Sequence, residues 1–247
     1  MNILLTNDDG YQSAGLILLA QSLVSAGHRV YVVAPDGQRS AFSHSVNFHK
    51  NLVVEKLTDY CGAKEAYICS GTPADCVKFA ASMLDVDFDL LISGPNNGEN
   101  YGVCILYSGT VAAAEEGAIC GIKSIALSRC GFGGSFAPAV EYLVNNLYKL
   151  YDCCYVGGVI NVNVPDLPLS QINGVKVVPQ STQSLFNDYF VKKEDPNVYI
   201  ITGDQLLIDG EISDVTETRN GYVTITPLHV DRTDFAKIAA VEAELGK

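Results

Sequence analysis

Basic residues are scarce in this chain, and they form no cluster. The 247 residues include 16 Lys and Arg against 28 Asp and Glu, which gives a formal net charge of −12 at pH 7. A nucleic-acid polymer is bound through clustered Lys and Arg that neutralise its phosphates, so the composition excludes this class of partner. A small phosphorylated ligand is still compatible with it, because a bound cation and local N–H groups can dominate inside a pocket.

Long uninterrupted apolar runs are also missing. A long stretch such as residues 111–127 is broken by Glu115, Glu116 and Lys123, so no membrane span is predicted. The first residues carry neither a basic segment nor an apolar run long enough for a signal peptide. Eight cysteines occur without a C-x-x-C pair, which favours reduced thiols over disulfides. We therefore expect a cytoplasmic protein that binds no membrane.

Three common functional motifs are absent from the sequence. No G-x-x-x-x-G-K-[ST] segment occurs, which excludes a P-loop. No G-x-G-x-x-G follows the first apolar run, which argues against a dinucleotide-binding oxidoreductase. The histidines have neither H-x-x-x-H nor H-E-x-x-H spacing, so a zinc site is not predicted; they are His28, His44, His49 and His229.

The first two-thirds of the chain alternate strand and helix patterns. This alternation is typical of an α/β fold, here a Rossmann-like, mostly parallel sheet with helices on both faces. Strands are predicted at residues 2–6, 30–34, 89–93, 124–127 and 159–164. Helices are predicted at residues 14–26, 73–83, 110–120 and 137–150, the second beginning with a Thr72 cap and a first-turn Pro73.

The pattern changes after about residue 165. Strands are predicted at residues 174–178, 198–202, 205–208 and 221–226, with turns at Gly203-Asp204 and Asp209-Gly210, and a terminal helix at residues 234–245. We interpret residues 1–247 as one domain. It consists of an α/β core over about 1–165 and an antiparallel, hairpin-rich extension with a terminal helix over about 166–247, an arrangement that often makes a dimer.

Two adjacent carboxylates follow the first predicted strand. Asp8 and Asp9 stand directly before Gly10, at the carboxyl end of the strand, where open α/β sheets collect ligands and catalytic groups. Adjacent acids with no basic neighbour repel each other, which indicates a divalent cation between them. The alternative is an Asp-Gly turn whose carboxylate caps the next helix. These two residues taken alone favour that alternative.

Two further loops follow strands of the same predicted sheet. Residues 34–45 are rich in hydroxyls and turn formers and can bring Ser40 and Ser43 toward Asp8. Residues 93–102 contain three glycines and three asparagines, and an Asn side chain offers an oxygen to a hard cation and an amino group to phosphate. Each loop by itself is equally consistent with an ordinary surface turn.

A fourth segment, Ser108-Gly109-Thr110, opens a predicted helix. Free backbone N–H groups, two hydroxyls and the positive end of the helix dipole can bind an anion there, whereas the simpler alternative is a Ser/Thr cap. All four segments are expected on one rim of the sheet. Oxygen ligands of this kind select Mg²⁺, Mn²⁺ or Ca²⁺, and a hard cation beside an anion site predicts phosphate chemistry.

In these same segments the chain resembles the SurE family, stationary-phase survival proteins that act as metal-dependent 5′-nucleotidases. The matching segments run in order from residue 3 to about 228 and are ILLTNDDGY, VVAPDGQRSAFS, SGTPADCV, SGPNNGENYG, YSGTVAAAEEG, NVNVP and GYVTITPL. The resemblance implies hydrolysis of nucleoside 5′-monophosphates, with 3′-monophosphates and short polyphosphate as further substrates. It also implies homodimers or tetramers built partly by exchanging C-terminal elements.

The resemblance also assigns roles to residues of this chain. It implies one divalent cation per subunit, Mg²⁺ or Mn²⁺ with Ca²⁺ as the alternative, held by Asp8, Asp9, Ser40 and Asn96. The phosphate-contacting positions fall on Asn100, Ser108, Gly109 and Thr110. Asp8 and Asp9 are the predicted catalytic residues, because either carboxylate can take a proton from water and Asp8 can alternatively attack phosphorus directly.

Some positions depart from the family pattern without removing a predicted ligand. The departures closest to the predicted site are Ala41, His44, Pro95 and Glu99, of which His44 and Glu99 bear on substrate choice. The competing hypothesis is a Mg²⁺-binding, receiver-like signalling module, since receiver domains also place an acidic pair after their first strand. Against it, Ser93-Gly94 stands where such a module needs a phospho-acceptor Asp.

Overall fold

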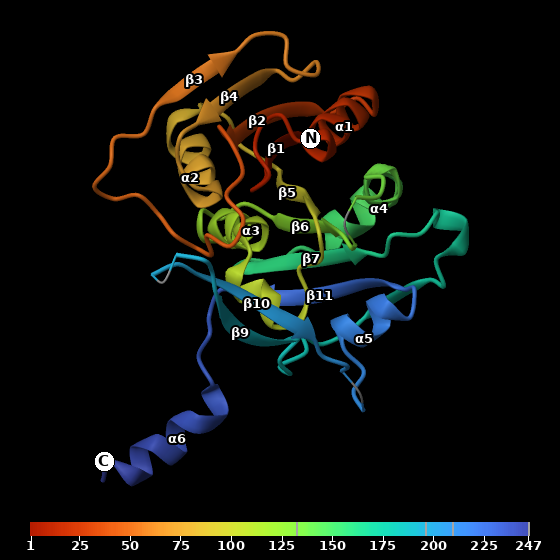
Figure 1. The fold of residues 1–247 in the computed structure, drawn as a ribbon. Helices are drawn as coiled ribbons and strands as arrows, with labels where there is room; N and C mark the ends of the chain where they lie inside the picture. Colours follow the sequence, from red (N-terminus) through yellow and green to blue (C-terminus); the bar gives the residue numbers. More distant parts are fainter. Residues whose placement is uncertain (132, 196, 209, 247) are drawn as a thin grey trace.

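A large twisted sheet with helices on both sides forms the body of the protein, and a helical tail projects from it (Figure 1). The computed structural model describes residues 1–131, 133–195, 197–208 and 210–246. The sheet has nine strands in the order β3-β4-β2-β1-β5-β6-β7-β11-β8. They are β1 (Asn2–Thr6), β2 (Arg29–Pro35), β3 (Val54–Leu57), β4 (Glu65–Cys69), β5 (Leu90–Asn97), β6 (Ser124–Arg129), β7 (Gly158–Val164), β8 (Val175–Val177) and β11 (Val223–His229).

Six neighbouring strands of this sheet run parallel. β4, β2, β1, β5, β6 and β7 pair in parallel along the sheet, whereas β3 is antiparallel to β4 and β11 is antiparallel to β7. The prediction of a Rossmann-like, mostly parallel sheet is therefore confirmed. Because the carboxyl ends of parallel strands meet at one edge, the segments that follow β1, β2 and β5 leave the sheet on the same side.

The helices cover both faces, as predicted. α1 (Ala14–Ser25) and α4 (Ala137–Cys153) pack on one face, and α2 (Pro73–Met83) and α3 (Gly109–Ile119) pack on the other. The central strand β1 joins the two cores because successive side chains of a strand point to opposite faces. Ile3 and Leu5 lie in the first core and Leu4 in the second, all of them fully buried.

The regular elements of the first two-thirds lie close to their predicted bounds. β1 and α2 match their predictions, and α2 begins with a capping box in which Thr72 and Asp75 each accept the other's backbone N–H. β5 continues to Asn97, four residues beyond the predicted end. The edge strand β3 and its neighbour β4 were not predicted, because β3 has two charged residues at its centre and β4 is only partly buried.

The C-terminal third differs more from its prediction. The antiparallel hairpin exists, formed by β9 (Phe186–Lys192) and β10 (Tyr199–Gln205). The predicted turn at Gly203-Asp204 is wrong, since both residues lie within β10 opposite Asp188 and Asn187. The predicted strand at 205–208 is also wrong, because β10 ends at Gln205. The turn predicted at Asp209-Gly210 includes Asp209, which lies outside the described residues.

Two of the predicted C-terminal strands extend the main sheet instead of joining the hairpin. β11 pairs with β7 and β8 pairs with β11. The remaining elements are the short helices η1 (Gly102–Tyr107), η2 (Leu169–Gln171) and α5 (Asp214–Arg219), and the terminal helix α6 (Phe235–Glu244). The eight cysteines are all unpaired, as expected. Within the described parts of the chain, no helix has the length and apolar character that a membrane span requires.

Candidate active site

Asp8 and Asp9 lie just beyond the carboxyl end of β1, between the ends of β2 and β5. Asp8 is only 3% exposed, whereas Asp9 is half-buried. The preceding Asn7 fixes the turn, since its side chain accepts the Gly10 N–H at 3.1 Å and donates to the Gly10 carbonyl at 3.0 Å. The acidic pair is thus held at the central position of the functional edge of the sheet.

The Asp8 carboxylate faces the N-terminus of α3. Thr110 donates its hydroxyl to Asp8 Oδ1 at 2.7 Å. Burial raises the pKa of Asp8 to about 6, the bond from Thr110 opposes that rise, and the negative charge of Asp9 adds to it. A carboxylate buried to this degree beside a second acid is stabilised by a cation, which supports the predicted metal site.

Asp9 has a different environment. Its Oδ2 accepts the backbone N–H of Asn97 at 3.1 Å. Burial raises the pKa of Asp9, while the Asn97 N–H and the positive charge of Arg129 hold it down. Arg129 is 1% exposed, at the end of β6, and its Nη2 donates to Asn97 Oδ1. Arg129 therefore connects to Asp9 through Asn97.

The start of α3 has no room for side chains. A Cβ atom on Gly109 would lie 2.9 Å from Asp8 Cβ and 3.2 Å from Pro73 Cγ, so only glycine permits this approach of α3 to the acidic pair. Ser108 caps the helix by accepting the Val111 N–H at 3.1 Å. The Ser108 hydroxyl therefore acts as a helix cap, the simpler alternative for this residue. Gly109 and Thr110 lie against Asp8, and their predicted contact with phosphate stays a prediction.

Ser40 lies on the long loop between β2 and β3. This loop reaches the acidic pair through Arg39, whose backbone N–H donates to the Asp8 carbonyl at 2.7 Å. The Ser40 side chain is exposed and its hydroxyl accepts a hydrogen bond from Gln38 at 3.0 Å. Further along, Ser43 donates its hydroxyl to the Leu106 carbonyl at 2.6 Å, so the loop is fixed to η1, directly before α3.

His44 fixes the same loop to α3 itself. Its Nε2 lies 2.9 Å from Glu116 Oε2 and its Nδ1 lies 3.3 Å from Glu115 Oε2. Hydrogen bonds to Glu115 and Glu116 raise the pKa of His44 to about 9, so the imidazolium is the form present at neutral pH. In this structure His44, one of the departures from the family pattern, joins the Ser40 loop to α3.

Asn96 and Asn100 lie on the segment that follows β5. Asn96 is half-buried and donates its amide to the Gly98 carbonyl at 2.9 Å. Asn100 is 5% exposed, and Asn163 accepts its backbone N–H at 2.9 Å. Its carbonyl accepts from Asn161 and Asn163, and its amide donates to Ser128 at 2.9 Å. These bonds anchor the segment to β6 and β7.

The structure thus gathers the predicted segments at one edge of the sheet but connects them unequally. Asp8 contacts Thr110 and lies against Gly109, whereas among the described residues no hydrogen bond joins the side chains of Ser40 or Asn96 to either carboxylate. Within the same residues, no three His, Cys, Asp or Glu side chains gather as a metal site. A cation here would rely on two carboxylates, neutral oxygens and water, which suits a hard divalent ion.

Sequence reasoning missed Arg129 and Asn97. Asn97 was part of an asparagine-rich loop, but its contact with Asp9 is made by the backbone and so leaves no sequence signal. Arg129 ends a strand, a position typical of a solvent-exposed charge, and only the fold buries it. Its Nε and Nη1 are buried without a hydrogen-bond partner among the described residues.

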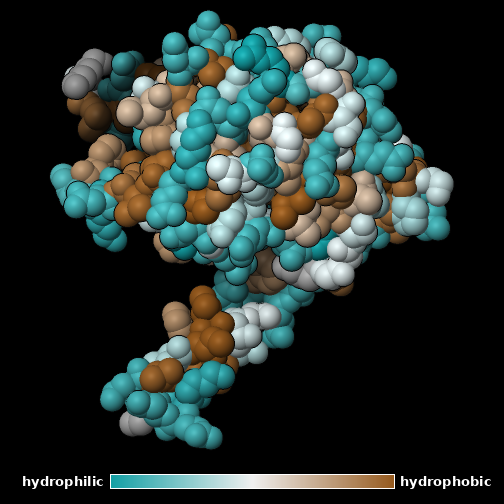
Figure 2. Space-filling view, turned by 90° about the horizontal axis from the view of Figure 1, so that it is seen from above, coloured by the Kyte–Doolittle hydropathy of each residue, from teal (hydrophilic) through white to brown (hydrophobic). Residues whose placement is uncertain are grey.

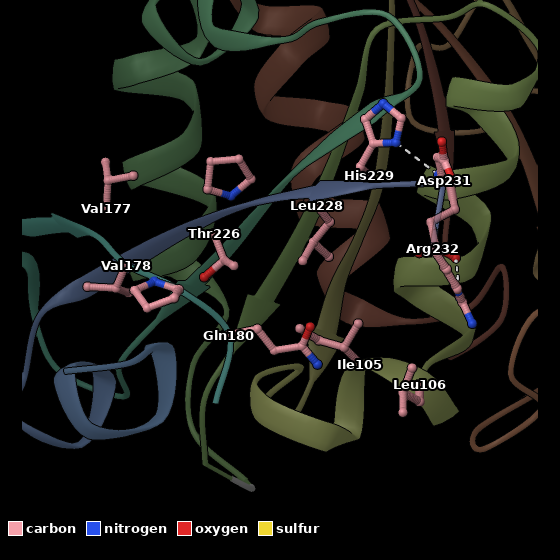
Figure 3. Close-up of a pocket in the computed structure, with 13 residues that line it drawn as sticks. Ile105, Leu106, Val177, Val178, Gln180, Thr226, Leu228, His229, Asp231 and Arg232 are labelled. Atoms are coloured by element: carbon pink, nitrogen blue, oxygen red, sulfur yellow. Dashed lines mark hydrogen bonds and ion pairs between the residues drawn. The ribbon is translucent and has the colours of Figure 1, made fainter. Parts of the chain in front are cut away.

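A separate cavity of about 660 Å³ lies on the other side of α3 and η1 (Figure 3). Its walls come from η1, α3, β8, β11 and the segment after β11, and include Ile105, Val178 and Leu228. Arg232 lines it and lies 3.3 Å from Glu115. None of the predicted metal or phosphate residues lines this cavity, so it is distinct from the edge that holds Asp8.

The comparisons with known proteins agree with this arrangement. The family model described as "Survival protein SurE" matches residues 3–187. This protein belongs to the SurE family. The chain is 40% identical to the 5′-nucleotidase SurE of Clostridium beijerinckii over 254 residues and 38% identical to that of Synechococcus elongatus over 255 residues, each alignment covering 98% of both chains.

A solved SurE structure has the same fold. The crystal structure of the SurE protein from Aquifex aeolicus superposes with a TM-score of 0.86 at 35% identity, covering 99% of this chain and 100% of that one. The family resemblance predicted from the sequence segments is therefore confirmed. The names of the SurE relatives support the phosphatase hypothesis, and they give no support to the receiver-like alternative.

Proposed function

We propose that this protein is a metal-dependent 5′-nucleotidase that hydrolyses nucleoside 5′-monophosphates to nucleoside and phosphate. The observation that carries the proposal is the buried Asp8 carboxylate, which faces the N-terminus of α3 and adjoins Asp9. The proposed cation-binding pair thus lies next to a helix N-terminus, which can bind an anion. Relatives of similar length bear the name 5′-nucleotidase. Nucleoside 3′-monophosphates and short polyphosphate are secondary candidate substrates with the same phosphate chemistry.

The proposed metal ligands are Asp8, Asp9, Ser40 and Asn96, around one Mg²⁺ or Mn²⁺ per subunit, with Ca²⁺ as the alternative. The donor set is compatible with such an ion because all four offer oxygen. The Asn96 amide nitrogen is engaged with the Gly98 carbonyl, and the side-chain oxygen of Asn96 is the atom assigned to the metal. When bound, the ion would polarise a phosphate oxygen and lower the pKa of water.

The residues around the metal ligands have separate tasks in this proposal. The backbone N–H groups at Gly109 and Thr110, with Ser108 and Asn100, would bind the non-bridging phosphate oxygens at the helix end. One carboxylate of the acidic pair would accept a proton from the attacking water. Direct attack by Asp8 is the alternative and would form an aspartyl-phosphate.

Metal removal tests this function directly. We expect phosphate release from nucleoside 5′-monophosphates with Mg²⁺ or Mn²⁺, and a loss of roughly 100-fold or more after EDTA treatment, because the acidic pair alone would repel the substrate phosphate. Activity should return when the metal is restored. The measurement is inorganic phosphate released from the four common nucleoside monophosphates. No release from any of them, or release indifferent to EDTA, would refute the proposal.

We further propose that the chain forms a homodimer or tetramer through its C-terminal elements. Every residue of α6 is exposed, including Phe235 (69%) and Ile238 (43%). Figure 2 shows hydrophobic side chains gathered on the projecting tail. An apolar helix face of this kind is typical of an interface. The cavity of Figure 3, which begins next to the tail at Arg232, is the proposed seat for α6 of a second copy.

Charge introduced on α6 should dissociate this assembly. For the variant F235D/I238D we expect a 26.5 kDa monomer, while the unaltered chain elutes at a multiple of that mass. The matched control is K237D, which changes the net charge by the same amount on another side of the helix and should leave the assembly intact. Size-exclusion chromatography with light scattering measures the masses. A monomeric unaltered chain, or dissociation by K237D alone, would contradict the proposal.

A further inference from the structure

A second cavity, of about 230 Å³, lies between the Ser40 loop and the start of α2. It is unrelated to the cavity of Figure 3 and shares no residue with it. Side chains of mixed character form its walls, among them Arg39, Phe42, Asn47, Lys50, Leu52 and Thr72. The cavity therefore combines an aromatic ring, an aliphatic side chain, amides and positive charge.

This cavity adjoins the acidic pair at two points. Arg39, on one wall, donates its backbone N–H to the Asp8 carbonyl at 2.7 Å. Thr72, on another wall, precedes Pro73, whose ring would lie 3.2 Å from a Cβ atom on Gly109. The Arg39 wall is thus hydrogen-bonded to Asp8, and the Thr72 wall is joined through Pro73 to Gly109, at the proposed phosphate site. A ligand anchored there by its phosphate can extend into the cavity.

Phe42 is held at the edge of the cavity by an unusual backbone. The residues on either side of it, Ala41 and Ser43, have φ values of 59° and 53°, a conformation that residues other than Gly, Asn and Asp rarely adopt. Phe42 itself is 50% exposed. Such strain persists only where the surroundings impose it, and it concentrates at ligand-binding sites.

The surroundings do impose this conformation. On one side, the backbone N–H of Ser43 donates to the Tyr107 carbonyl at 3.0 Å, and the His44 contacts with α3 follow. Further along the loop, Asn47 donates its backbone N–H and its amide to the Asp75 carboxylate, at 3.1 and 2.7 Å. On the other side, before Phe42, the backbone N–H of Arg39 donates to the Asp8 carbonyl. Phe42 lies between Arg39 and Ser43, so its backbone is held on both sides before any ligand binds.

We propose that this cavity binds the nucleobase of the nucleoside monophosphate, stacked on Phe42; the inference rests on the function proposed above. A nucleobase is flat and aromatic and carries hydrogen-bonding groups at its edge. The ring of Phe42 matches its face, while Asn47 Oδ1 and the Lys50 amine offer an acceptor and a donor to its edge. The cavity thereby selects nucleotides over phosphomonoesters that have no ring.

The variant F42A tests the assignment. Stacking on an aromatic side chain contributes equally to the bound substrate and to the transition state, so its loss should raise KM about tenfold and leave kcat unchanged. Inhibition by the product nucleoside should weaken by the same factor, whereas inhibition by inorganic phosphate should not change. F42Y should restore the values. The matched control is F48A, since Phe48 belongs to the same loop, is 80% exposed and does not line the cavity.

The readouts separate the two proposals. An unaltered chain that releases no phosphate from any nucleoside monophosphate refutes the nucleotidase function, and calorimetric titration of adenosine into the unaltered chain and F42A then still tests the cavity. A chain that hydrolyses nucleotides with the same KM in F42A, or with a KM that F48A raises equally, overturns the nucleobase assignment alone. A matching rise in the inhibition constant of phosphate also overturns it.

Discussion

Replacement of Asp8 by asparagine is expected to lower metal-dependent phosphate release on the order of 100- to 1,000-fold. Asparagine keeps the size of the side chain and can still accept the Thr110 hydroxyl, which in the unaltered chain donates to Asp8 Oδ1 at 2.7 Å. It cannot provide the negative charge that a divalent ion requires. The loss should therefore appear in metal affinity measured by calorimetry as well as in turnover.

The same variant is expected to be more stable than the unaltered chain when metal is absent. Burial raises the pKa of Asp8 from 3.8 to about 6. Protonation of Asp8 thus stabilises the folded state, an effect that is complete below pH 3.8 and is lost as the pH rises through about 6. At a pH of about 7.5 the ionised carboxylate costs about 3 kcal/mol. D8N removes this cost, so its advantage in urea unfolding should grow between a pH of about 4 and a pH of about 7.5.

The variant D75N is the matched control for the stability of D8N. Asp75 is as deeply buried as Asp8, at 3% exposure, but its carboxylate accepts hydrogen bonds from Thr72 and Asn47. An asparagine there would leave donors unpaired, so D75N should be less stable than the unaltered chain at neutral pH. If D8N behaves like D75N, or keeps the metal affinity and turnover of the unaltered chain, Asp8 is a structural residue and the metal assignment is wrong.

Replacement of Gly94 by alanine should destabilise the fold strongly, although it adds a single methyl group. Gly94 lies inside β5 with a φ of 122°, and a Cβ atom there would be 2.2 Å from the Leu127 carbonyl oxygen of the neighbouring strand. The pairing of β5 with β6 is irregular at this point, but Ser93 and Asn96 on either side are both paired with β6, so a shift of either backbone would disturb those pairs. We expect a loss of roughly 3 kcal/mol or more in the free energy of unfolding.

Gly121 is the matched control for this prediction. Its φ of 81° is also positive, but no atom lies within 4 Å of the position that a Cβ would take. G121A therefore reports the backbone cost alone, about 1 kcal/mol. Urea unfolding of both variants gives the comparison. Equal losses would mean that the clash with Leu127 is relieved by a shift and that β5 is less tightly held than the structure indicates.

The fold could be predicted where burial repeats locally along the chain. β1 and α2 match because continuous apolar residues mark a buried strand and a capped, proline-led start marks a helix. β9 could not be predicted, since all of its residues are exposed and only its pairing with β10 makes it a strand. The sequence also did not show which C-terminal strands join the main sheet and which form the hairpin. The pairing of β11 with β7 joins segments that lie far apart along the chain, so no local pattern predicts it.

The same distinction between local pattern and long-range pairing applies to the candidate site. Asp8, Gly109 and Thr110 could be predicted to meet because each follows or opens an element of a parallel sheet. Arg129 could not, since its partner Asn97 is fixed by the register between β5 and β6. The roles of Asp8, Asp9, Ser40 and Asn96 as metal ligands all stay predictions.

The hydrogen bonds around Asn100 bear on how a ligand is received. Its backbone and side chain are already committed to Ser128, Asn161 and Asn163, all of them within β6 or β7. Little conformational entropy is therefore left to lose at this position when a phosphate arrives. This part of the site is therefore preorganised: hydrogen bonds to β6 and β7 set its shape before the substrate binds.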